Sequence, residues 1–481
     1  MTSDKADKIQ ENFVNSLKNP EFFTRKILNK TLWSTQYEIL TAVRDNPRTA
    51  VRSCHGIGKT FTAAMCILWF LYSHEKAIVL STAPTWRQVE KLIWKEIRSA
   101  YREAIIPLGG SLAPKAPELH LIFNEWYAAG ISTNEPERFQ GFHEENILVV
   151  VDEAAGVNIE IFEAIEGILT STGARLLLIG NPNSIGTPFY DAFTKPGFKT
   201  FHISAFDTPN FTEAGITQDD IKNGTWKNKI TEIKYPKLIT PQWVADRYIS
   251  WGENSAPYQV RVMGNFPQQG EDTLIPLAWI ELAMQRWEDT PEGNPIQLGV
   301  DVAAYGSDST VIAERRGLKV MPLNVYTQKN TRETTGLVLN KAKEVNAKKI
   351  SVDEIGIGRG VVDSLAEEGY RDVGVNVAER SSDPERYHNM RAELWWNLRE
   401  LLDPEKKPIA LPDDDELLAE LSSVKYKIDS RGAIQIESKE EMKKRLGRSP
   451  DRADAVVLAF AQNFHESFVF SGGKTFMAGK F

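Results

Sequence analysis

The stretch RSCHGIGKT is similar to a phosphate-binding loop, whose usual pattern is G-x-x-x-x-G-K-[ST]. Lys59 and Thr60 are the residue types that contact the β/γ-phosphates of a nucleotide and its Mg²⁺ ion. Gly56 and Gly58 let backbone N–H groups turn inward toward phosphate. Ser53 stands where the first glycine belongs, and serine is small enough to be tolerated there. The stretch therefore predicts an ATP-binding loop with one departure from the pattern.

A second motif follows further along the chain, where the apolar run ILVVVDEA ends in Asp152 and Glu153. Asp152 would hold the hydration shell of Mg²⁺, and Glu153 would orient and polarise the attacking water. An acidic pair at the end of a strand is common in isolation, but it is much less expected after GKT in the same block. The two motifs together predict ATP hydrolysis.

Other side chains extend this predicted ATP site. Asn181, in GNPN after a third apolar run, would sense the γ-phosphate or else be an ordinary turn residue. Gln36 would read the adenine edge or else lie exposed on a helix. An arginine supplied to a phosphoryl transition state increases the rate by about 10³–10⁵. Arg138 is the predicted arginine finger, and Arg52 is the competing candidate.

A separate group of aspartates lies in the second half of the sequence. Asp301 and Asp353 end two predicted strands, and adjacent parallel strands would bring both carboxylates to one sheet edge. In RSPDRADAVVLAFA, Asp451 and Asp454 share one helix face at i, i+3. The helix dipole alone can explain Asp451, with Ser449 as the expected N-cap. We therefore favour Asp454 as the third acid of the group and keep Asp451 as the alternative.

Three clustered carboxylates imply a bound cation, because like charges ~4 Å apart repel by up to ~4 kcal/mol at an effective dielectric near 20. Carboxylate oxygens favour Mg²⁺ or Mn²⁺. Two such ions ~3.5–4 Å apart activate a water and stabilise the leaving oxygen in phosphodiester cleavage. Asp308 and Glu354 are candidate outer members. The alternative is that these aspartates are solvated turn residues.

The order of apolar runs indicates how these residues are positioned. Residues 49–203 alternate apolar strands with helical patterns, which predicts a parallel sheet covered on both faces. Residues 205–275 are punctuated by Pro, Gly and Asn and predict short helices in a connecting subdomain. From about residue 296, three hairpin-linked strands precede alternating strands and helices, which predicts a mixed sheet. The predicted fold class is α/β.

Composition and charge narrow the class of protein. A chain of 481 residues, with 42% hydrophobic and 25% charged residues, predicts two or three ordinary globular domains. The two cysteines cannot form a disulfide framework, which favours a reducing compartment. The polar N-terminus has no signal-type core, and no apolar run approaches ~18 residues. We therefore expect neither a secreted nor a membrane-spanning protein.

The net charge of −8 argues weakly against nucleic acid as a partner, but phosphate contacts are local. The stretch KEEMKKRLGR is basic within an acidic chain. Its side chains are either a solvated helix face or contacts to DNA phosphates, and the candidate DNA-binding residues are Lys443, Lys444, Arg445 and Arg448.

Together these motifs resemble the large terminase subunits of tailed bacteriophages, from Gln36 to Asp454. The resemblance implies an N-terminal P-loop (ASCE-type) ATPase domain, a small linker or lid subdomain and a C-terminal RNase H-like nuclease domain. The corresponding ranges are 1–204 with an N-terminal helical segment, 205–275 and 276–470, followed by a flexible tail at 471–481. The resemblance also gives Asp301, Asp353 and Asp454 as the nuclease triad, and Asn181 as part of the motif that couples hydrolysis to movement.

The same resemblance implies cofactors and partners. The cofactors are ATP with Mg²⁺ at the ATPase site, and two Mg²⁺ or Mn²⁺ ions at the nuclease site. The partners are double-stranded viral DNA, a portal protein, a small terminase subunit and a homo-oligomeric ring on the procapsid, all in the host cytoplasm. Two alternatives are a repair helicase-nuclease, which would need a second motor domain, and a clamp that grips DNA without cutting it.

Overall fold

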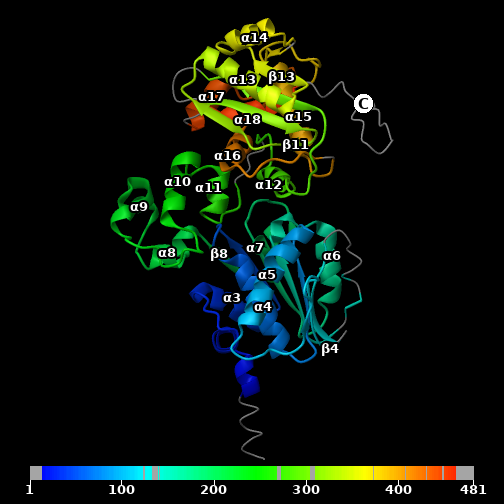
Figure 1. Cartoon of the computed structure of the whole chain (residues 1–481). Helices are drawn as coiled ribbons and strands as arrows, with labels where there is room; N and C mark the ends of the chain where they lie inside the picture. Colours follow the sequence, from blue (N-terminus) through cyan, green and yellow to red (C-terminus); the bar gives the residue numbers. More distant parts are fainter. Residues whose placement is uncertain are drawn as a thin grey trace, which may run out of the picture. The chain divides into compact units, whose positions relative to one another are not determined.

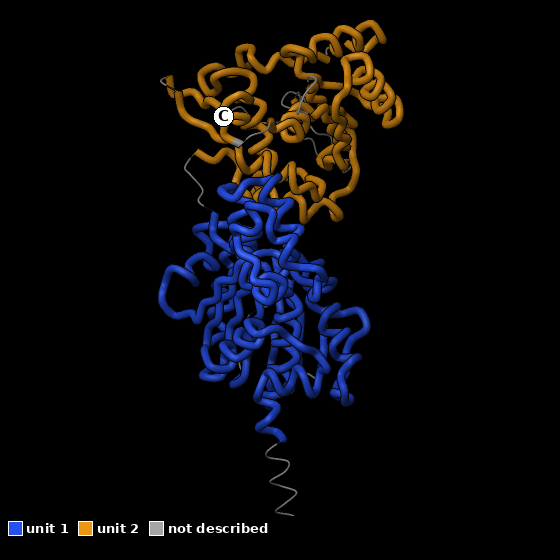
Figure 2. Tube along the Cα trace, turned by 90° about the vertical axis from the view of Figure 1, so that its left-hand side faces the viewer, with its two compact units in different colours: residues 1–268 blue, residues 269–481 orange. Residues whose placement is uncertain are grey.

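The computed structural model describes residues 13–461 except 123–124, 133–138, 140, 143, 268–271, 304–308, 372, 407, 430 and 447–448. The chain divides into two compact units, Met1–Gln268 and Gln269–Phe481 (Figure 2). None of the described helices is long and apolar enough to cross a membrane. The predicted tail at 471–481 lies outside the described residues. The three-domain division stays a prediction.

The first unit is built on an eight-stranded sheet with the order β3-β4-β5-β2-β6-β7-β1-β8. β1 (Arg48–Ser53) lies between β7 (Arg175–Gly180) and β8 (Lys199–Ile203). β6 (Ile147–Asp152) lies between β7 and β2 (Ile78–Thr82), and all these neighbours are parallel. β7 thus separates the strand before the phosphate loop from the strand that ends in the acidic pair.

Helices cover both faces of this sheet (Figure 1). α4 (Lys59–Ser73) begins directly after the phosphate loop and is buried almost throughout, because its side chains are apolar all round. On the other face, α6 (Ile159–Ile168) packs with alternate residues of β1, β2, β6 and β7 in one apolar core. The remaining early helices are α2 (Pro20–Phe22), η1 (Phe23–Ile27), α3 (Ser34–Asp45), η4 (Ala154–Gly156) and α7 (Pro188–Thr194).

The edge of the first sheet contains an antiparallel hairpin. β4 (Glu118–Ile122) and β5 (Trp126–Gly130) pair antiparallel, with the short β3 (Ser111–Leu112) outside them. The helix before this hairpin is α5 (Trp94–Glu103), which is preceded by a π-helical turn, η2 (Gln88–Ile93). This one wide turn changes the register between the residues before and after it.

Short helices follow β8, as the sequence predicted. They are η5 (Ala205–Asp207), α8 (Pro209–Thr212), α9 (Gln218–Asn223), η6 (Thr225–Asn228), α10 (Pro241–Trp251) and α11 (Ala256–Arg261). Several begin with a threonine or serine cap followed by proline, such as Thr240 before Pro241. This segment, up to Gln268, belongs to the first unit.

The second unit contains a mixed sheet with the order β11-β10-β9-β13-β14. β9 (Ile296–Asp301) is antiparallel to β10 (Ser309–Arg316) and parallel to β13 (Lys349–Asp353). The third predicted strand is divided into β11 (Lys319–Val320) and β12 (Asn324–Thr327), which both pair with β10. The break contains a proline, which has no N–H for a ladder bond. The predicted α/β class with a mixed sheet in this part of the chain is confirmed.

α18 (Asp451–Ala459) lies directly against β9 in the second unit (Figure 1). A Cβ added at Gly299 would lie 2.1 Å from the Ala455 carbonyl oxygen, so only glycine permits this approach. The neighbouring Leu298 and Val300 point to the other face, into a core with α13 and α14. Close packing on β9 brings the first turn of α18 to the strand end that carries Asp301.

The prediction that Ser449 caps α18 is wrong. The helix begins one residue later than expected, so the N-cap is Pro450, which has no side-chain oxygen to accept a bond. The other elements of this unit are α12 (Leu277–Gln285), α13 (Thr331–Val345), α14 (Gly358–Glu367), β14 (Gly374–Val375), α15 (Met390–Leu402), α16 (Asp415–Ser423), β15 (Tyr426–Ile428), β16 (Ile434–Ile436) and α17 (Lys439–Leu446).

Candidate active sites

The phosphate loop connects β1 to α4 in the first unit. Gly58 has φ +82°, which favours glycine, and a Cβ there would lie 2.7 Å from the side-chain nitrogen of Gln36, so that side chain would have to move. Lys59 follows as the first residue of α4. Its Nζ donates to Asn181 Oδ1 at 2.9 Å and lies 3.5 Å from Glu153 Oε1. The loop lysine is therefore held between the ends of β6 and β7.

The hydroxyl of Thr60 donates to Asp152 Oδ2 at 2.8 Å. Asp152 is only 2% exposed, at the end of β6. Burial, followed by the charge of Glu153, raises the pKa of Asp152 to about 6, while Lys59 and Thr60 oppose this rise. The two side chains predicted to bind Mg²⁺ at the ATPase site are thus neighbours.

Glu153 adopts a left-handed backbone conformation, with φ +47°. This region is uncommon for a residue other than glycine and is strained. The Glu153 N–H donates to Asp152 Oδ1 at 3.0 Å, and Glu153 Oε2 accepts from the Asn181 N–H at 3.3 Å. The turn directs a half-buried carboxylate toward the phosphate loop.

Asn181 connects three parts of this site. Besides its bonds to Lys59 and Glu153, its Nδ2 donates to the Ser53 carbonyl oxygen at 2.6 Å. Ser53 is fully buried, and its hydroxyl donates to the Cys54 carbonyl oxygen at 3.0 Å. The residue in the place of the first glycine is thus packed into the base of the loop.

Gln36 is buried against the phosphate loop instead of lying exposed on its helix. Its Nε2 donates to the carbonyl oxygens of Ile57 at 3.1 Å and Gly58 at 3.4 Å. Its Oε1 accepts from the Trp33 N–H at 3.2 Å. Both ends of the amide are engaged, so Gln36 holds the loop in place.

A cavity of about 960 Å³ opens over the loop, which is large enough for a nucleotide. Gln36, Lys59, Thr60 and Glu153 line it on the sheet side. Residues 234–238 line it from the segment after β8, and the Ile239 N–H donates to the Gly56 carbonyl oxygen at 2.8 Å. The segment after β8 is therefore tied to the loop by its backbone.

Arg52 is engaged in packing. Its guanidinium carbon lies 5.7 Å from the ring centroid of Phe193 and 5.4 Å from that of Phe266, and Nη1 donates to the Gly264 carbonyl oxygen at 3.1 Å. Burial lowers the pKa of Arg52 below its ordinary value. These contacts give Arg52 a structural role. Arg138, the other predicted arginine finger, lies outside the described residues.

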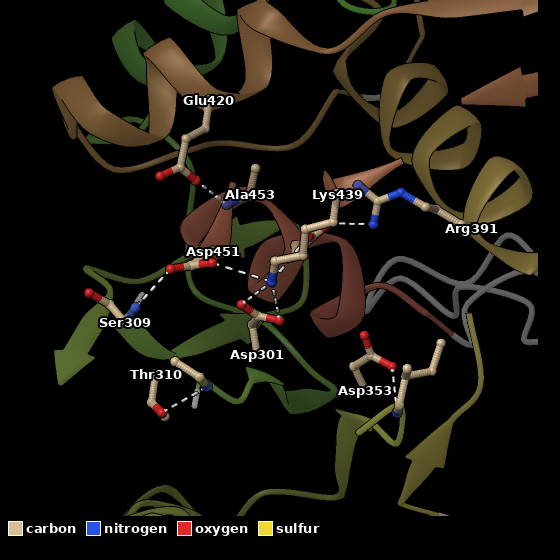
Figure 3. A network of polar contacts seen from close by, with 12 residues as sticks. Asp301, Ser309, Thr310, Asp353, Arg391, Glu420, Lys439, Asp451 and Ala453 are labelled. Carbon is tan, nitrogen blue, oxygen red and sulfur yellow. Dashed lines mark hydrogen bonds and ion pairs between the residues drawn. The ribbon is translucent and has the colours of Figure 1, made fainter. Parts of the chain in front are cut away.

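In the second unit, three carboxylates converge on the ammonium group of Lys439 (Figure 3). Lys439 Nζ donates to Asp301 Oδ2 at 2.9 Å and Oδ1 at 3.0 Å. It lies 3.3 Å from Asp451 Oδ1 and 3.7 Å from Asp454 Oδ2. The end of β9, the first turn of α18 and the start of α17 thus form one cluster.

Burial raises the pKa of Asp301 to about 8, against the opposing charge of Lys439. Burial alone would lower the pKa of Lys439, but the charges of Asp301, Asp454 and Asp451 raise it above its ordinary range. Lys439 therefore stays protonated and compensates the acids around it.

The two acids of α18 have different partners. Asp454 Oδ1 accepts from Arg391 Nη1 at 2.9 Å and from Trp395 Nε1 at 3.1 Å. Asp451 Oδ2 accepts from the Ser309 N–H at 2.8 Å. Both acids are buried, and both face Lys439. The structure thus brings both candidates for the third acid into the cluster.

Asp353 ends β13, beside the end of β9, and its Oδ1 accepts from the Ile355 N–H at 3.0 Å. With Asp454 it lines a cavity of about 10 Å³, the size of one water molecule. Burial raises the pKa of Asp353 above its ordinary value. Glu354 instead lies 3.3 Å from Arg359, and Asp308 lies outside the described residues.

The donor set of this cluster is the one that Mg²⁺ and Mn²⁺ prefer, since it consists of carboxylate oxygens. Asp451 Oδ1 is buried and accepts no hydrogen bond from the described residues. In the described part of the chain, however, no three His, Cys, Asp or Glu side chains are arranged to hold a metal ion. A cation here would therefore share or replace the contacts of Lys439.

The amino-acid sequence has a relative among phage packaging proteins. It is 24% identical over 466 residues to the "Probable terminase, large subunit" of Enterobacteria phage P7, which covers 90% of this chain and 88% of that protein. The chain is therefore similar to a phage large terminase subunit. No protein-family model matches the sequence.

The solved structures that are similar to this chain have low sequence identity and low TM-scores. The large terminase of a thermophilic bacteriophage is 13% identical, covers 90% of this chain and all of its own, and has a TM-score of 0.38. The ATPase domain of the Thermus phage P74-26 large terminase is 17% identical over 51% of this chain and 97% of its own, with a TM-score of 0.37. The nuclease domain of the large terminase subunit of bacterial virus Sf6 is 20% identical over 39% of this chain and 97% of its own, with a TM-score of 0.36.

The predicted DNA-binding residues lie on or near α17. Lys443 and Lys444 are exposed. Arg445 donates to both carboxylate oxygens of Glu437 and to the Ser423 carbonyl oxygen, which restrains its guanidinium. Arg448 lies outside the described residues.

Sequence reasoning missed Lys439, which lies at the centre of the acid cluster. It is the first residue of the basic stretch KEEMKKRLGR, but Asp301, to which it donates two hydrogen bonds, is distant along the chain. The available signal was a lysine that precedes a pair of helix-start aspartates. That signal predicts proximity only once α17 and α18 are known to be adjacent in the fold.

Proposed function

We propose that this chain is the large subunit of a viral DNA-packaging motor, which hydrolyses ATP to move double-stranded DNA into a procapsid and cuts that DNA. The proposal rests on one observation: a single chain contains a phosphate-loop site and a cluster of buried aspartates at a mixed sheet edge. A chain that has both sites is suited to a long polyanionic substrate, which it can both move and cut. The likeness to the phage P7 protein over 90% of this chain supports the same function.

In the proposed ATPase cycle, Lys59 contacts the β/γ-phosphates, while Thr60 and Asp152 hold the Mg²⁺ that accompanies ATP. Glu153 orients and polarises the water that attacks the γ-phosphate. Asn181 would transmit the loss of that phosphate, because it contacts both Lys59 and Glu153 and also the base of the loop at Ser53. Arg138 is the proposed arginine finger.

In the proposed nuclease site, Asp301, Asp353 and Asp454 hold two Mg²⁺ or Mn²⁺ ions, with Asp451 as an alternative or additional ligand. When bound, the ions supply the Lewis acidity that phosphodiester cleavage requires. Arg391 and Trp395 orient Asp454 through its Oδ1, which leaves Oδ2 directed at the cluster. Ser309 orients Asp451 in the same way. Lys439 neutralises the acids until a cation binds.

The remaining expectations complete the proposal. Residues 1–204 form the ATPase domain, 205–275 the linker and 276–470 the nuclease domain. The partners are a portal protein, a small terminase subunit and further copies of this chain in a ring on the procapsid. The site of action is the host cytoplasm.

Packaging of DNA into purified procapsids tests this function. The full chain, a small terminase subunit and ATP are mixed with portal-bearing procapsids, and DNA protected from added nuclease is measured. We expect protection with the wild-type chain and none with Glu153→Ala. Asp301→Ala should abolish Mn²⁺-dependent plasmid cleavage but leave ATP hydrolysis intact. Unwinding of a forked duplex in place of packaging would overturn the proposal in favour of a helicase-nuclease.

A further inference from the structure

One face of helix α5, with the turn before it and the loop after it, carries a group of basic side chains that the proposed catalytic sites do not use. We propose that this face is a groove that binds the phosphate backbone of double-stranded DNA and connects DNA binding to the nucleotide cavity. The inference rests on the proposed motor function. The groove residues are Lys91, Lys95, Arg98, Arg102 and Lys115.

Helical geometry aligns these side chains. Lys95, Arg98 and Arg102 are spaced i, i+3 and i+7, so they share one face of α5, and Lys91 continues the row from η2. From Lys95 to Arg102 the row is about 10 Å long. The opposite face of α5 is apolar and buries Trp94, Ile97 and Ala100. The helix is therefore fixed by its core face while its basic face stays open.

The groove is a defined hollow. It has a volume of about 250 Å³ and is walled on one side by α5 and on the other by Pro114 and Lys115. Arg98 Nη2 donates to the carbonyl oxygens of Lys115 at 2.7 Å and Ala116 at 2.8 Å, which fastens the loop to the helix. Prolines at 114 and 117 also restrict the loop backbone. Lys115 is thereby held beside the helical row.

The charge of the groove is poorly compensated. Glu90 is the one acidic residue that lines it among the described residues, and its ion pair with Lys91 at 3.1 Å is exposed and weak. Within the described ranges, Lys95, Arg102 and Lys115 form no ion pair with a carboxylate. Five cations in a small hollow repel one another, so the groove adds little to the stability of the fold. A polyanion would relieve that repulsion.

Double-stranded DNA fits this surface better than an acidic peptide does. The duplex carries one phosphate per ~3.4 Å along each strand, so a straight, rigid row of cations about 10 Å long faces several phosphates at once. Lysine and arginine contacts to phosphate need no base sequence, which suits a motor that must move along any DNA. An acidic protein segment is the alternative that the test must exclude.

The same helix also forms a wall of the nucleotide cavity. Glu96, Ser99 and Glu103 line that cavity from the adjacent face of α5, and Lys95 lines both the cavity and the groove. α5 packs in turn on α4, which begins at Lys59 (Figure 1). DNA in the groove would therefore contact the helix that borders the nucleotide. We expect DNA to alter the ATPase rate through this helix.

The test uses the full chain with Lys91→Ala, Arg102→Ala and Lys115→Ala combined, which leaves Lys95 and the nucleotide cavity intact. The matched control removes the same charge from exposed lysines elsewhere in the first unit, by Lys26→Ala, Lys195→Ala and Lys227→Ala combined. Binding of a labelled 30-base-pair duplex is measured by fluorescence anisotropy in EDTA at several salt concentrations. ATP hydrolysis is measured with and without DNA.

We expect the groove variant to bind the duplex at least about tenfold more weakly, with the slope of log K against log salt reduced by about 2–3 because three phosphate contacts are lost. Its basal ATPase rate should equal that of wild type, while stimulation by DNA is lost. The control variant should behave as wild type. An unchanged affinity and slope in the groove variant would overturn the proposal, as would lost binding of a polyglutamate peptide with unchanged DNA binding.

The outcomes also separate this inference from the proposed function. If the wild-type chain hydrolyses no ATP, the motor function fails, but the anisotropy titration still shows whether the groove binds DNA. If ATP is hydrolysed and DNA binding is unaffected by the groove variant, the groove proposal alone fails.

Discussion

Lys439 Nζ donates to both carboxylate oxygens of Asp301, at 2.9 and 3.0 Å. The lysine comes from the start of α17 and the aspartate from the end of β9, so the ion pair joins two elements distant in sequence. Asp301 is buried, and the only other charged partners of Lys439 in the described residues are Asp451 and Asp454. The lysine thus places a positive charge among the acids where we propose that a metal cation binds.

Substitution of Lys439 should make the second unit depend on divalent cations for stability. Lys439→Ala leaves buried carboxylates uncompensated, which we expect to cost about 2 kcal/mol, below the ~3–5 kcal/mol of a fully buried pair because Lys439 is partly exposed. Melting in EDTA should begin about 4–8 °C lower. Mn²⁺ should raise the Tm of this variant more than that of wild type.

Lys444→Ala is the control for this measurement, because Lys444 is exposed on the same helix. Its Tm should stay within about 1 °C of wild type, since exposed substitutions have small effects. Equal Tm values for the two variants, or the same response to Mn²⁺ as wild type, would show that Lys439 does not compensate the acids.

Glu153 combines a proposed catalytic role with a strained backbone, and the two can be separated. Glu153→Gln should lower the rate of ATP hydrolysis by about 10²–10⁴, as expected for loss of a general base, while nucleotide affinity changes little. Glu153→Gly should be about 1 kcal/mol more stable than Glu153→Ala, because glycine accepts φ +47° without strain. Steady-state ATPase assays measure the rate of hydrolysis, and chemical denaturation measures the difference in stability. Undiminished hydrolysis by Glu153→Gln would refute the catalytic assignment.

Gln36 should affect nucleotide binding through the shape of the phosphate loop. Gln36→Glu places a carboxylate against the carbonyl oxygens of Ile57 and Gly58, in place of a donor. The loss of about 1 kcal/mol per hydrogen bond predicts a KM for ATP that is roughly five- to thirtyfold higher. If Gln36 acts only by holding the loop, the KM for GTP should increase by the same factor. An increase in KM for ATP but not for GTP would show that Gln36 also recognises adenine.

The sequence was informative wherever the signal is local. Asp152 ends a continuous apolar run, and Asp301 and Asp353 end strands in which apolar residues alternate with others; all three strand ends were predicted correctly. Because β9 and β13 are parallel neighbours, the expectation that Asp301 and Asp353 share one sheet edge is also met. Apolar runs and helix spacing follow from nearest-neighbour chemistry, which a single sequence contains.

The sequence did not predict the contacts that form only in the tertiary structure. Nothing near Lys439 indicates that it faces Asp301, because the pairing depends on how α18 packs against β9 and on the chain path that brings the start of α17 to the end of that strand. The packing of Arg52 on Phe193 and Phe266 likewise depends on segments that meet only in the fold. The basic row on α5 is a different case, because its i, i+3, i+7 spacing was present in the sequence. The wide π-turn before α5 interrupts that regularity and was not predictable from residue types.

Arg52 provides the sharpest test of the arginine-finger alternatives. If its guanidinium serves packing, Arg52→Ala loses two cation–π contacts and one hydrogen bond, and the free energy of unfolding should fall by about 1–3 kcal/mol. The ATPase rate per folded molecule should then stay within about twofold of wild type. An arginine finger would show the reverse pattern, with turnover lowered by about 10³ or more and little change in stability.

Arg138→Ala, measured in parallel by denaturation and by single-turnover hydrolysis, should give that reverse pattern. Loss of turnover in Arg52→Ala at unchanged stability would transfer the finger assignment to Arg52.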